Sequence, residues 1–578
     1  MDVLRKYKAI RRELLSKVPV FLEKKIAILG GSTTADIRKA LDIYLLENGI
    51  LATFYESEYA RYWQDAMFGE QLHDFSPDII YIHTTNRNVS VYPLPCDNAE
   101  TVELLFQIEL DKFTAMWEKL AKDHNCPIIQ NNFEQPFYRL MGNAEASFIS
   151  GKINFLTRLN LKFYEYAQTH DSFYINDINW LSANYGLEKW SNPSFWHMYK
   201  YALCTDAVPT LAKSIANIIK SIYGKNKKAF ALDLDNTLWG GIVGDDGAEN
   251  IEIGHETPMG EVFSEFQQYI KNHKQIGVIL NVISKNENEN AIAGLNRSIL
   301  TPDDFIMLKA NWEPKSENLQ TIANELALLP ESFVFVDDNP AERAIINQVL
   351  PNVPTPAILT PESYIQTLDK EGYFEVTSIT KDDFSRVVQY QDNAQRSKLQ
   401  TQFTDYNEYL RSLEMTAEIL PFAPLYISRI AQLTNKSNQF NLTTSRHTQQ
   451  EIESFASNEN YITLYGKLSD KFGDNGVVSV IIGEIISNTL HLRLWLMSCR
   501  VLKRDMEFAM LNELVKIAKD KGINKIIGYY FPTPKNAMVK DFYEKMGFSL
   551  LEEIGSEKTY SLNIENDFIK REVFIKVN

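Results

Sequence analysis

The sequence predicts a multidomain α/β protein with two three-layer α/β/α domains, each built on a parallel sheet, followed by an α+β domain. Apolar strand-like runs alternate with helical segments over roughly the first two thirds of the chain, which is typical of parallel sheets with crossover helices. After about residue 400 several strands follow with fewer helices between them. The 578 residues fit about three domains of ordinary size. We place them at 1–215, 216–375 and 401–578, with a helical connector at 376–400.

The first domain contains four predicted strands separated by helical segments. Long amphipathic stretches such as Glu100–Asp123 and Glu145–Thr169 are the predicted crossover helices. Parallel strands need such crossovers, because a tight hairpin joins only antiparallel strands. The predicted strands are Lys25–Leu29, Ile50–Tyr55, Asp78–His83 and Pro127–Gln130.

The second and third domains differ in how strands and helices follow each other. The second repeats the alternation, with strands at Lys228–Leu232, Gly277–Ile283, Asp304–Met307 and Ser332–Val336. The third has strands at Tyr461–Leu468, Val477–Ile482, Thr489–Leu496 and Lys525–Tyr530, with helices near 504–520 and 536–546. The third domain is therefore expected to have a mixed sheet.

Composition excludes some functions and points to a compartment. A net charge of −16 argues against nucleic acid as a partner. No apolar stretch is long enough to cross a membrane, and the first 23 residues lack the pattern of a signal peptide. The four cysteines are far apart in the sequence and form no metal-ligand pair. Reduced thiols in the cytoplasm fit this pattern, so we expect a cytoplasmic protein.

The strongest motif is a buried-type strand that ends directly in two carboxylates, Asp233 and Asp235. Ligands of open α/β sheets bind at the carboxyl ends of strands. Two neighbouring carboxylates repel each other unless a cation or proton intervenes, and Mg²⁺ with a phosphate is the natural solution. Asp233 would attack phosphorus, and Asp235 would protonate the leaving group and then activate water.

Three later elements stand where this chemistry needs them. Ser284 follows the strand at 277–283 and offers a hydroxyl to a phosphate oxygen. Lys315 would neutralise charge on the phosphoryl group and on Asp233. Asp337 and Asp338 follow the strand at 332–336 and supply further metal ligands. Each element alone is a weak signal, and Asp337-Asp338-Asn339-Pro340 could be a helix cap. The four in order, each at a strand end, are specific.

These stretches resemble the haloacid-dehalogenase superfamily and, more closely, its FkbH-like branch, also called subfamily IIIC. The matching segments are 232–247, 283–286, 309–315 and 335–343, and their flanks match along with the catalytic positions. The resemblance implies Asp233 as the nucleophile and Asp235 as the acid/base. It also implies Mg²⁺ held by Asp233, Asp235, Asp337 and Asp338, with Thr237, Ser284 and Lys315 on the phosphate.

Some members of that branch dephosphorylate a glyceryl phosphate and load the acyl group on an acyl carrier protein for polyketide synthesis. Those enzymes carry a cysteine before the serine of the second motif, where this chain has Ile283. Ile283 argues against covalent glyceryl transfer through a cysteine at this position. The resemblance implies an enzyme acting on a small phosphorylated acid, with transfer of an acyl group to a carrier-protein thiol as a possible further step. A plain phosphatase of sugar or surface-polysaccharide metabolism is the nearest alternative. A non-catalytic scaffold that binds carrier proteins is the third.

The first domain carries a serine at a strand-to-helix turn, Ser32. It could be a nucleophile near backbone N–H groups or simply a helix cap. The order of segments resembles an SGNH hydrolase-like domain, and Asn131 or Asn132 matches its asparagine block. The final block normally pairs Asp and His three apart, but here Trp180 follows Asp177 at that spacing. A serine without a positioned base is a poor nucleophile, so we expect a scaffold, with structural roles for His83 and His197.

The third domain resembles the GNAT acetyltransferase fold, in the form fused to FkbH-like domains. That resemblance implies an acyl, CoA or phosphopantetheine-thioester site, for which Asn438, Arg500, Arg504 and Tyr543 are the candidates. The loop that binds pyrophosphate in that fold carries glycines where this chain has Lys503 and Asp505. Glycine loss hinders the close approach of backbone to phosphate. Recognition of a carrier arm, catalytic acyl transfer, a structural role and a nucleophilic Cys499 remain open.

Overall fold

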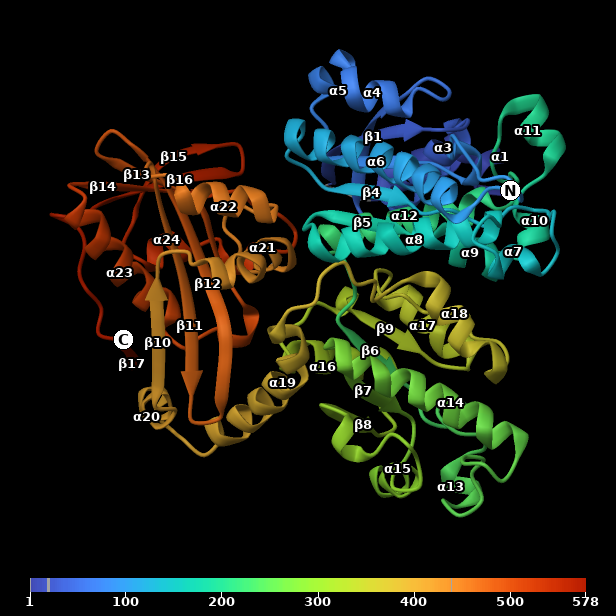
Figure 1. The fold of residues 1–578 in the computed structure, drawn as a ribbon. Helices are drawn as coiled ribbons and strands as arrows, with labels where there is room; N and C mark the ends of the chain where they lie inside the picture. Colours follow the sequence, from blue (N-terminus) through green and yellow to red (C-terminus); the bar gives the residue numbers. More distant parts are fainter. Residues whose placement is uncertain (1, 18–20, 438) are drawn as a thin grey trace. The chain divides into compact units, whose positions relative to one another are not determined.

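The computed structural model describes residues 2–17, 21–437 and 439–578. The chain divides into two compact units, Met1–Ile222 and Tyr223–Asn578. Figure 1 shows helices on both faces of the sheets in the parallel parts of the chain. The α/β class of two parallel-sheet domains followed by a mixed-sheet region is confirmed.

The sheet of the first unit has five parallel strands in the order β2-β1-β3-β4-β5. They are β1 (Leu22–Gly30), β2 (Ile50–Glu56), β3 (Ile79–His83), β4 (Ile128–Asn131) and β5 (Phe173–Asn176). The first four agree with the prediction. The fifth was not predicted, because Phe173–Asn176 is only four residues long and follows a helix closely.

Helices cover both faces of this sheet because alternate side chains of each strand point to opposite sides. Ala27 and Leu29 of β1 pack in one core with α4 (Tyr62–Phe68), α6 (Ala99–Asp123) and α8 (Lys152–Thr169). Helix α3 (Ala35–Glu47) packs against α12 (Val208–Ile222). The boundary expected at 215/216 falls inside α12, whose buried apolar face ties it to the first unit.

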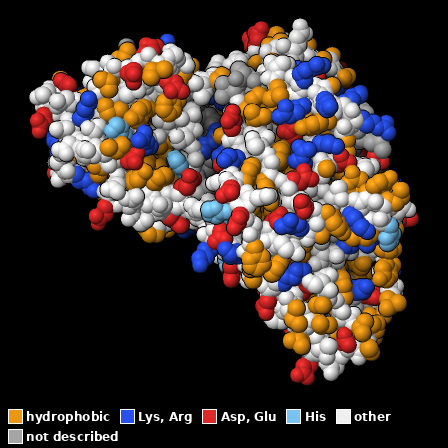
Figure 2. Space-filling view, turned by 90° about the horizontal axis from the view of Figure 1, so that it is seen from above, with side chains coloured by type: hydrophobic (Ala, Val, Ile, Leu, Met, Phe, Trp, Pro, Cys, Tyr) orange, Lys and Arg blue, Asp and Glu red, His pale blue; other side chains and the backbone are white. Residues whose placement is uncertain are grey.

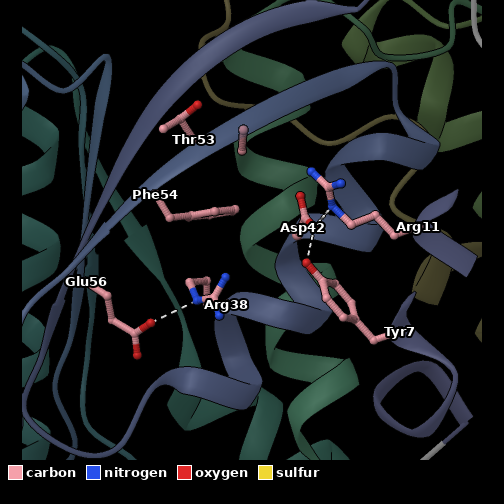
Figure 3. Close-up of a pocket in the computed structure, with 8 residues that line it drawn as sticks. Tyr7, Arg11, Arg38, Asp42, Thr53, Phe54 and Glu56 are labelled. Atoms are coloured by element: carbon pink, nitrogen blue, oxygen red, sulfur yellow. Dashed lines mark hydrogen bonds and ion pairs between the residues drawn. The ribbon is translucent and has the colours of Figure 1, made fainter. Parts of the chain in front are cut away.

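The remaining helices of this unit are short. They comprise α1 (Asp2–Arg5), α2 (Tyr7–Lys17), α5 (Glu70–Phe75), α7 (Ala144–Ser147), α9 (Ile178–Tyr185), α10 (Leu187–Trp190) and α11 (Pro193–Tyr199). The helix expected at 145–169 is divided into α7 and α8, because Gly151 and its neighbours leave the helical conformation. An open cavity of about 690 Å³ lies beside edge strand β2 (Figure 3).

The second unit begins with a four-stranded parallel sheet in the order β8-β7-β6-β9. Its strands are β6 (Ala229–Leu232), β7 (Ile279–Ser284), β8 (Met307–Ala310) and β9 (Phe333–Val336). Its helices are α13 (Val243–Asp246), α14 (Pro258–His273), α15 (Asn288–Leu295), α16 (Lys315–Glu325), α17 (Pro340–Val349) and α18 (Tyr364–Glu371). Strand β8 lies three residues later than expected, because Pro302–Asp304 forms a short 3-10 turn capped by Thr301.

An eight-stranded mixed sheet follows in the order β15-β16-β14-β13-β12-β11-β10-β17. Its strands are β10 (Met415–Leu420), β11 (Tyr461–Asp470), β12 (Gly473–Ile486), β13 (Thr489–Met497), β14 (Lys525–Tyr530), β15 (Ser549–Ile554), β16 (Glu557–Asn563) and β17 (Ile575–Val577). Four of these were predicted. Helices α20 (Tyr406–Ser412), α21 (Ile427–Lys436), α22 (Gln449–Ser457), α23 (Met506–Asp520) and α24 (Phe542–Lys545) accompany the sheet.

Helix α19 (Lys381–Gln400) lies in the segment predicted as a connector, and it packs against strand β12. Thr380 and Asp383 form a capping box at its start. Asp383 also accepts hydrogen bonds from Gln432 Nε2 (2.6 Å) and Lys436 Nζ (3.2 Å) of α21. Polar contacts therefore fasten the connector to the mixed-sheet region within one compact unit.

The face drawn in Figure 2 has acidic and basic side chains interspersed with apolar ones. It carries no broad basic field of the kind that nucleic-acid binders present. Among the residues that the structure describes, no helix combines the length and apolar character needed to span a bilayer.

Candidate active site

The predicted acidic residues gather where neighbouring parallel strands end. Strand β6 lies between β7 and β9, in register from Ala229 with Phe333 to Leu232 with Val336. Asp233 follows β6 and its backbone N–H donates to Val336 O (3.0 Å). Asp337 follows β9 directly. Parallel register therefore brings two carboxylates that are 104 residues apart in the sequence to one edge of the sheet.

Three carboxylates form a cluster that could hold a metal ion. Oxygen atoms of Asp233, Asp337 and Asp338 lie within 4.8 Å of one another. Asp337 is fully buried and Asp233 is 7% exposed. Within the described parts of the chain, the buried Asp233 Oδ1 has no hydrogen-bond partner. A buried acceptor without a hydrogen bond lowers the stability of the fold. A divalent cation that prefers oxygen ligands would be a suitable partner for these three carboxylates.

Lys315 closes the cluster from the start of helix α16. Its Nζ lies 2.6 Å from Asp337 Oδ2 and 2.9 Å from Asp233 Oδ2. Burial by itself lowers the pKa of Lys315, but the charges of Asp233 and Asp337 outweigh burial and raise it above the ordinary value. One ammonium faces three carboxylates, so the cluster keeps an excess of negative charge that a divalent cation would balance.

The carboxylate pKa values reflect this crowding. Burial, followed by the charge of Asp233, raises the pKa of Asp337 to about 6 although Lys315 opposes the change. The same two causes raise the pKa of Asp338. Carboxylates with raised pKa values at a strand-end cluster are typical of functional sites.

Asp235 lies outside the three-carboxylate cluster. Its Oδ1 accepts hydrogen bonds from Trp239 Nε1 (2.9 Å) and the Val243 backbone N–H (3.0 Å). Its Oδ2 accepts from Asn286 Nδ2 (2.9 Å). The structure thus brings together three of the four side chains expected around the metal and holds the fourth in another network. Burial raises the pKa of Asp235 above the ordinary value for an aspartate.

The other two expected phosphate contacts have different surroundings. Thr237 is fully buried, and its Oγ1 accepts from the Asp338 backbone N–H (3.1 Å) and donates to Asp338 Oδ1 (3.3 Å). Thr237 therefore positions Asp338. Ser284 is the last residue of β7 and is 2% exposed.

Two of the four candidates in the mixed-sheet region make contacts within the unit. Arg504 donates from Nη1 to Asp470 Oδ2 (3.2 Å) and from Nη2 to Asn393 Oδ1 of α19 (2.7 Å). Arg500 donates from Nε to Ser498 Oγ (3.2 Å). Both are buried, and their hydrogen bonds described here are to other residues of the same unit. The connector helix supplies partners that the sequence pattern alone did not reveal.

Of the other two candidates, the structure describes only Tyr543. The Tyr543 ring is 1% exposed and packs on Trp495 and Phe548. Gly528 allows that approach, because a Cβ there would lie 2.3 Å from the ring. Asn438 lies outside the described residues.

The serine of the first unit has a histidine partner that sequence reasoning missed. Ser32 Oγ lies 2.9 Å from His83 Nε2, and His83 Nδ1 lies 3.0 Å from Asn131 Nδ2. His83 ends β3, beside β1 in the sheet. The expected spacing placed the histidine near the end of the domain, whereas here the histidine comes from a neighbouring strand. The pairing could have been predicted from the strand ends, because Ser32 follows β1 and His83 is the last residue of the neighbouring strand β3.

Asn286 is a second residue whose role was missed. It stands two residues after Ser284 and orients Asp235. Arg343 of α17 donates from Nη1 to the carbonyl oxygens of Asp337 (2.6 Å) and Asp338 (2.7 Å) and so holds their loop in place.

Comparisons with known proteins agree with this arrangement. Residues 25–220 match the model of the FkbH N-terminal domain family. The chain is also similar to the N-terminal part of the protein BF1531 from Bacteroides fragilis, whose structure contains a phosphatase domain complexed with Mg. The two are 30% identical, with 64% of this chain and 99% of that chain covered and a TM-score of 0.60.

Weaker similarities extend to acetyltransferases. PaiA N-acetyltransferase from Thermoplasma acidophilum, in complex with coenzyme A, is 21% identical, with 26% of this chain and 99% of that chain covered and a TM-score of 0.20. The ribosomal-protein-S18-alanine N-acetyltransferase from Escherichia coli is 13% identical, with 27% and 100% covered and a TM-score of 0.21. Such scores support no conclusion about the mixed-sheet region.

No curated protein matches the chain. The relative from Bacteroides fragilis exceeds these acetyltransferases in identity, and nearly all of its length is covered. Together with the match to the FkbH N-terminal domain and the carboxylate cluster, it shows that the chain belongs to the FkbH-like family of haloacid-dehalogenase-type proteins.

Proposed function

We propose that this protein is a Mg²⁺-dependent phosphatase that acts on a small phosphorylated acid through an aspartyl-phosphate on Asp233. The observation that carries the proposal is the buried cluster of Asp233, Asp337 and Asp338 closed by Lys315. A purely structural network has no need of three converging carboxylates with a single ammonium, because the excess charge destabilises the fold.

The residues present fit a magnesium ion. Asp233, Asp337 and Asp338 offer hard oxygen ligands, and the orphaned Asp233 Oδ1 is among them. The similar protein from Bacteroides fragilis was crystallised with Mg. When bound, Mg²⁺ would offset the repulsion between these carboxylates and the phosphate oxygens.

Asp233 is placed to act as the nucleophile. Its carboxylate oxygen would form a bond to phosphorus while the bond between phosphorus and the leaving oxygen breaks. The Lys315 ammonium, 2.9 Å from Asp233 Oδ2, would stabilise the charge that develops on the phosphoryl group. Ser284, at the end of β7, would donate its hydroxyl to a phosphate oxygen. Thr237 would act through Asp338 rather than touch the phosphate.

Asp235 would move the protons. Its raised pKa favours the protonated form that a general acid needs, and it would protonate the leaving oxygen in the first step. The resulting carboxylate would then take a proton from water, whose oxygen attacks phosphorus and releases phosphate and free Asp233. Asn286, Trp239 and the Val243 N–H would orient Asp235 through both steps.

The acyl group of the substrate is the next question after phosphate release. We extend the reaction to transfer of the acyl group to an acyl carrier protein thiol, which the resemblance to the FkbH-like branch supports. The burial of Arg500 and Arg504 favours plain phosphatase activity as the alternative, without CoA bound at those residues.

We place the protein in the cytoplasm on the basis of its four free cysteines and its sequence.

One assay tests the proposal. The protein is incubated with Mg²⁺, a panel of phosphorylated acids that includes bisphosphoglycerate, and a phosphopantetheinylated carrier protein. Phosphate release is followed together with the mass of the carrier. Phosphate release with a gain in carrier mass supports acyl transfer, and release alone supports the phosphatase. Asp233→Asn should abolish both signals, whereas Asp245→Asn, an exposed acidic residue of the same domain, should change neither. Activity that survives in Asp233→Asn would refute the proposal.

A further inference from the structure

The first unit contains a buried serine–histidine pair that the proposed phosphatase reaction does not use. Ser32 Oγ lies 2.9 Å from His83 Nε2. The two residues are 2% and 1% exposed. The serine of such a pair is nucleophilic only if the histidine nitrogen that faces it is unprotonated and can accept the hydroxyl proton. The position of one proton on His83 therefore decides whether Ser32 is reactive.

The amide of Asn131 has a fixed orientation. Its Nδ2 lies 3.3 Å from Thr84 O, a backbone carbonyl that can only accept. Its Oδ1 accepts from Asn176 Nδ2 (2.8 Å). Exchanging the nitrogen and oxygen of Asn131 would place an acceptor against Thr84 O, so the amide nitrogen faces both Thr84 and His83.

This orientation determines which nitrogen of His83 carries the proton. Asn131 Nδ2 lies 3.0 Å from His83 Nδ1. Since the amide nitrogen is a donor, Nδ1 must be the acceptor. Burial lowers the pKa of His83 to about 4, so the imidazole is neutral near pH 7 and has one proton to place. With Nδ1 bare, that proton lies on Nε2.

We propose that Asn131 locks His83 in the Nε2–H tautomer, so that His83 donates a hydrogen bond to Ser32 and leaves the serine without a base. Ser32, His83 and Asn131 then form a hydrolase-like constellation held in its unreactive state. The first unit would not cleave esters. Replacing the Asn131 amide with a carboxylate would move the His83 proton to Nδ1. The inference is independent of the phosphatase, which uses only residues of the second unit.

Tyr81 defines the competing arrangement. Its hydroxyl lies 2.9 Å from His83 Nδ1 and 3.1 Å from Asn131 Oδ1. A proton on Nδ1 could be donated to the Tyr81 oxygen, and Nε2 would then be bare toward Ser32. That arrangement turns the second amide hydrogen of Asn131 toward another N–H group, between two buried side chains. A buried donor that faces a donor is costly, which favours the locked state.

The decisive experiment measures the His83 tautomer in the full chain. The protein is labelled with ¹⁵N-histidine, and the imidazole nitrogens are observed by long-range ¹H–¹⁵N correlation near pH 7. The His83 signals are assigned by their loss in His83→Gln. We expect a bare Nδ1 and a protonated Nε2. A protonated Nδ1 would overturn the proposal and indicate a reactive serine.

Two further measurements sharpen the test. In Asn131→Asp the new carboxylate can only accept, so the proton should move to Nδ1. An unchanged tautomer in a folded variant would show that Asn131 does not set the lock.

A small fluorophosphonate probe should leave the wild-type Ser32 unlabelled. Labelling requires a new Oγ–P bond, loss of fluoride and transfer of the serine proton to His83 Nε2. Labelling of wild type that disappears in Ser32→Ala would also overturn the proposal.

Discussion

The Lys315 ammonium donates to Asp337 Oδ2 over 2.6 Å, and the same Nζ lies 2.9 Å from Asp233. One buried cation thus holds together carboxylates from the ends of two neighbouring strands. Removing it leaves these carboxylates facing each other without compensation.

Replacing Lys315 with Met should therefore impair both stability and catalysis. Loss of one partner from a buried ion network costs about 3–5 kcal/mol, and loss of a charge-stabilising group lowers kcat by roughly 10²–10³-fold. Thermal unfolding and phosphate release measure the two effects. Mg²⁺ should restore part of the stability, because it replaces some of the missing positive charge. Activity equal to wild type would contradict the role given to Lys315.

Metal binding should stabilise the folded protein by mass action. At a Mg²⁺ concentration about 100 times its Kd, the free energy of unfolding should rise by about 2.7 kcal/mol. Asp338→Asn should remove most of this increase and leave the metal-free melting temperature nearly unchanged, because Asp338 is only partly buried. Asp303→Asn, an exposed site, is the matched control. An equal Mg²⁺ effect in Asp338→Asn would argue against the carboxylate cluster as the metal site.

Substitution of Asp235 by Asn should reveal its acid role through the leaving group. General acid catalysis contributes roughly 10²–10⁴-fold, so turnover of an alkyl phosphate should fall by about that factor. Hydrolysis of p-nitrophenyl phosphate, whose leaving group needs no proton, should lose less in the first chemical step. Burst-phase kinetics separate that step from hydrolysis of the phosphoenzyme. Equal losses in the burst for both substrates would exclude Asp235 as the acid.

Asp383 should contribute stability at neutral pH that is lost on acidification. Burial opposes ionisation of this residue, but Lys436, Arg386 and Gln432 prevail and hold its pKa well below the ordinary value. A lowered folded-state pKa gives stability that is present above the unfolded pKa of about 3.9 and is lost as the pH falls below it.

Asp383→Asn should thus lower the free energy of unfolding at pH 7, by about 3 kcal/mol. The difference from wild type should shrink as the pH falls below about 4, as measured by urea unfolding at a series of pH values. A constant difference down to pH 2 would show that the charge of Asp383 is not what stabilises the connector.

The clustering of Asp233 with Asp337 could be predicted from the sequence because the strand ends of a parallel sheet converge. In the sequence, Asp233 and Asp337 each follow an apolar run directly. The parallel register of β6 with β9 then places the two carboxylates side by side. The Asp235 contacts were not predictable in the same way, because Asn286 reaches it from another strand end. Side-chain direction after a strand depends on the loop, which periodicity does not describe.

Arg504 of the mixed-sheet region has contacts that a sequence motif does not reveal. Arg504 fits a phosphate-binding loop by its position in the sequence, but Asn393 and Asp470 occupy its guanidinium. Asn393 belongs to the connector helix, more than 100 residues earlier in the chain. The His83 partner of Ser32 was missed for the same reason, since strand pairing rather than sequence spacing brings them together.

The proposed phosphatase reaction requires that Asp233, Asp337 and Asp338 together hold a divalent cation beside the phosphate. Crystals soaked with Mn²⁺ at saturating concentration provide the most direct measurement, through the anomalous signal of the ion. We predict one strong peak in contact with an oxygen of each of the three carboxylates, at distances of roughly 2.0–2.2 Å, close to those that octahedral Mg²⁺ requires. An ion bound elsewhere, or no peak between these three side chains, would contradict the account.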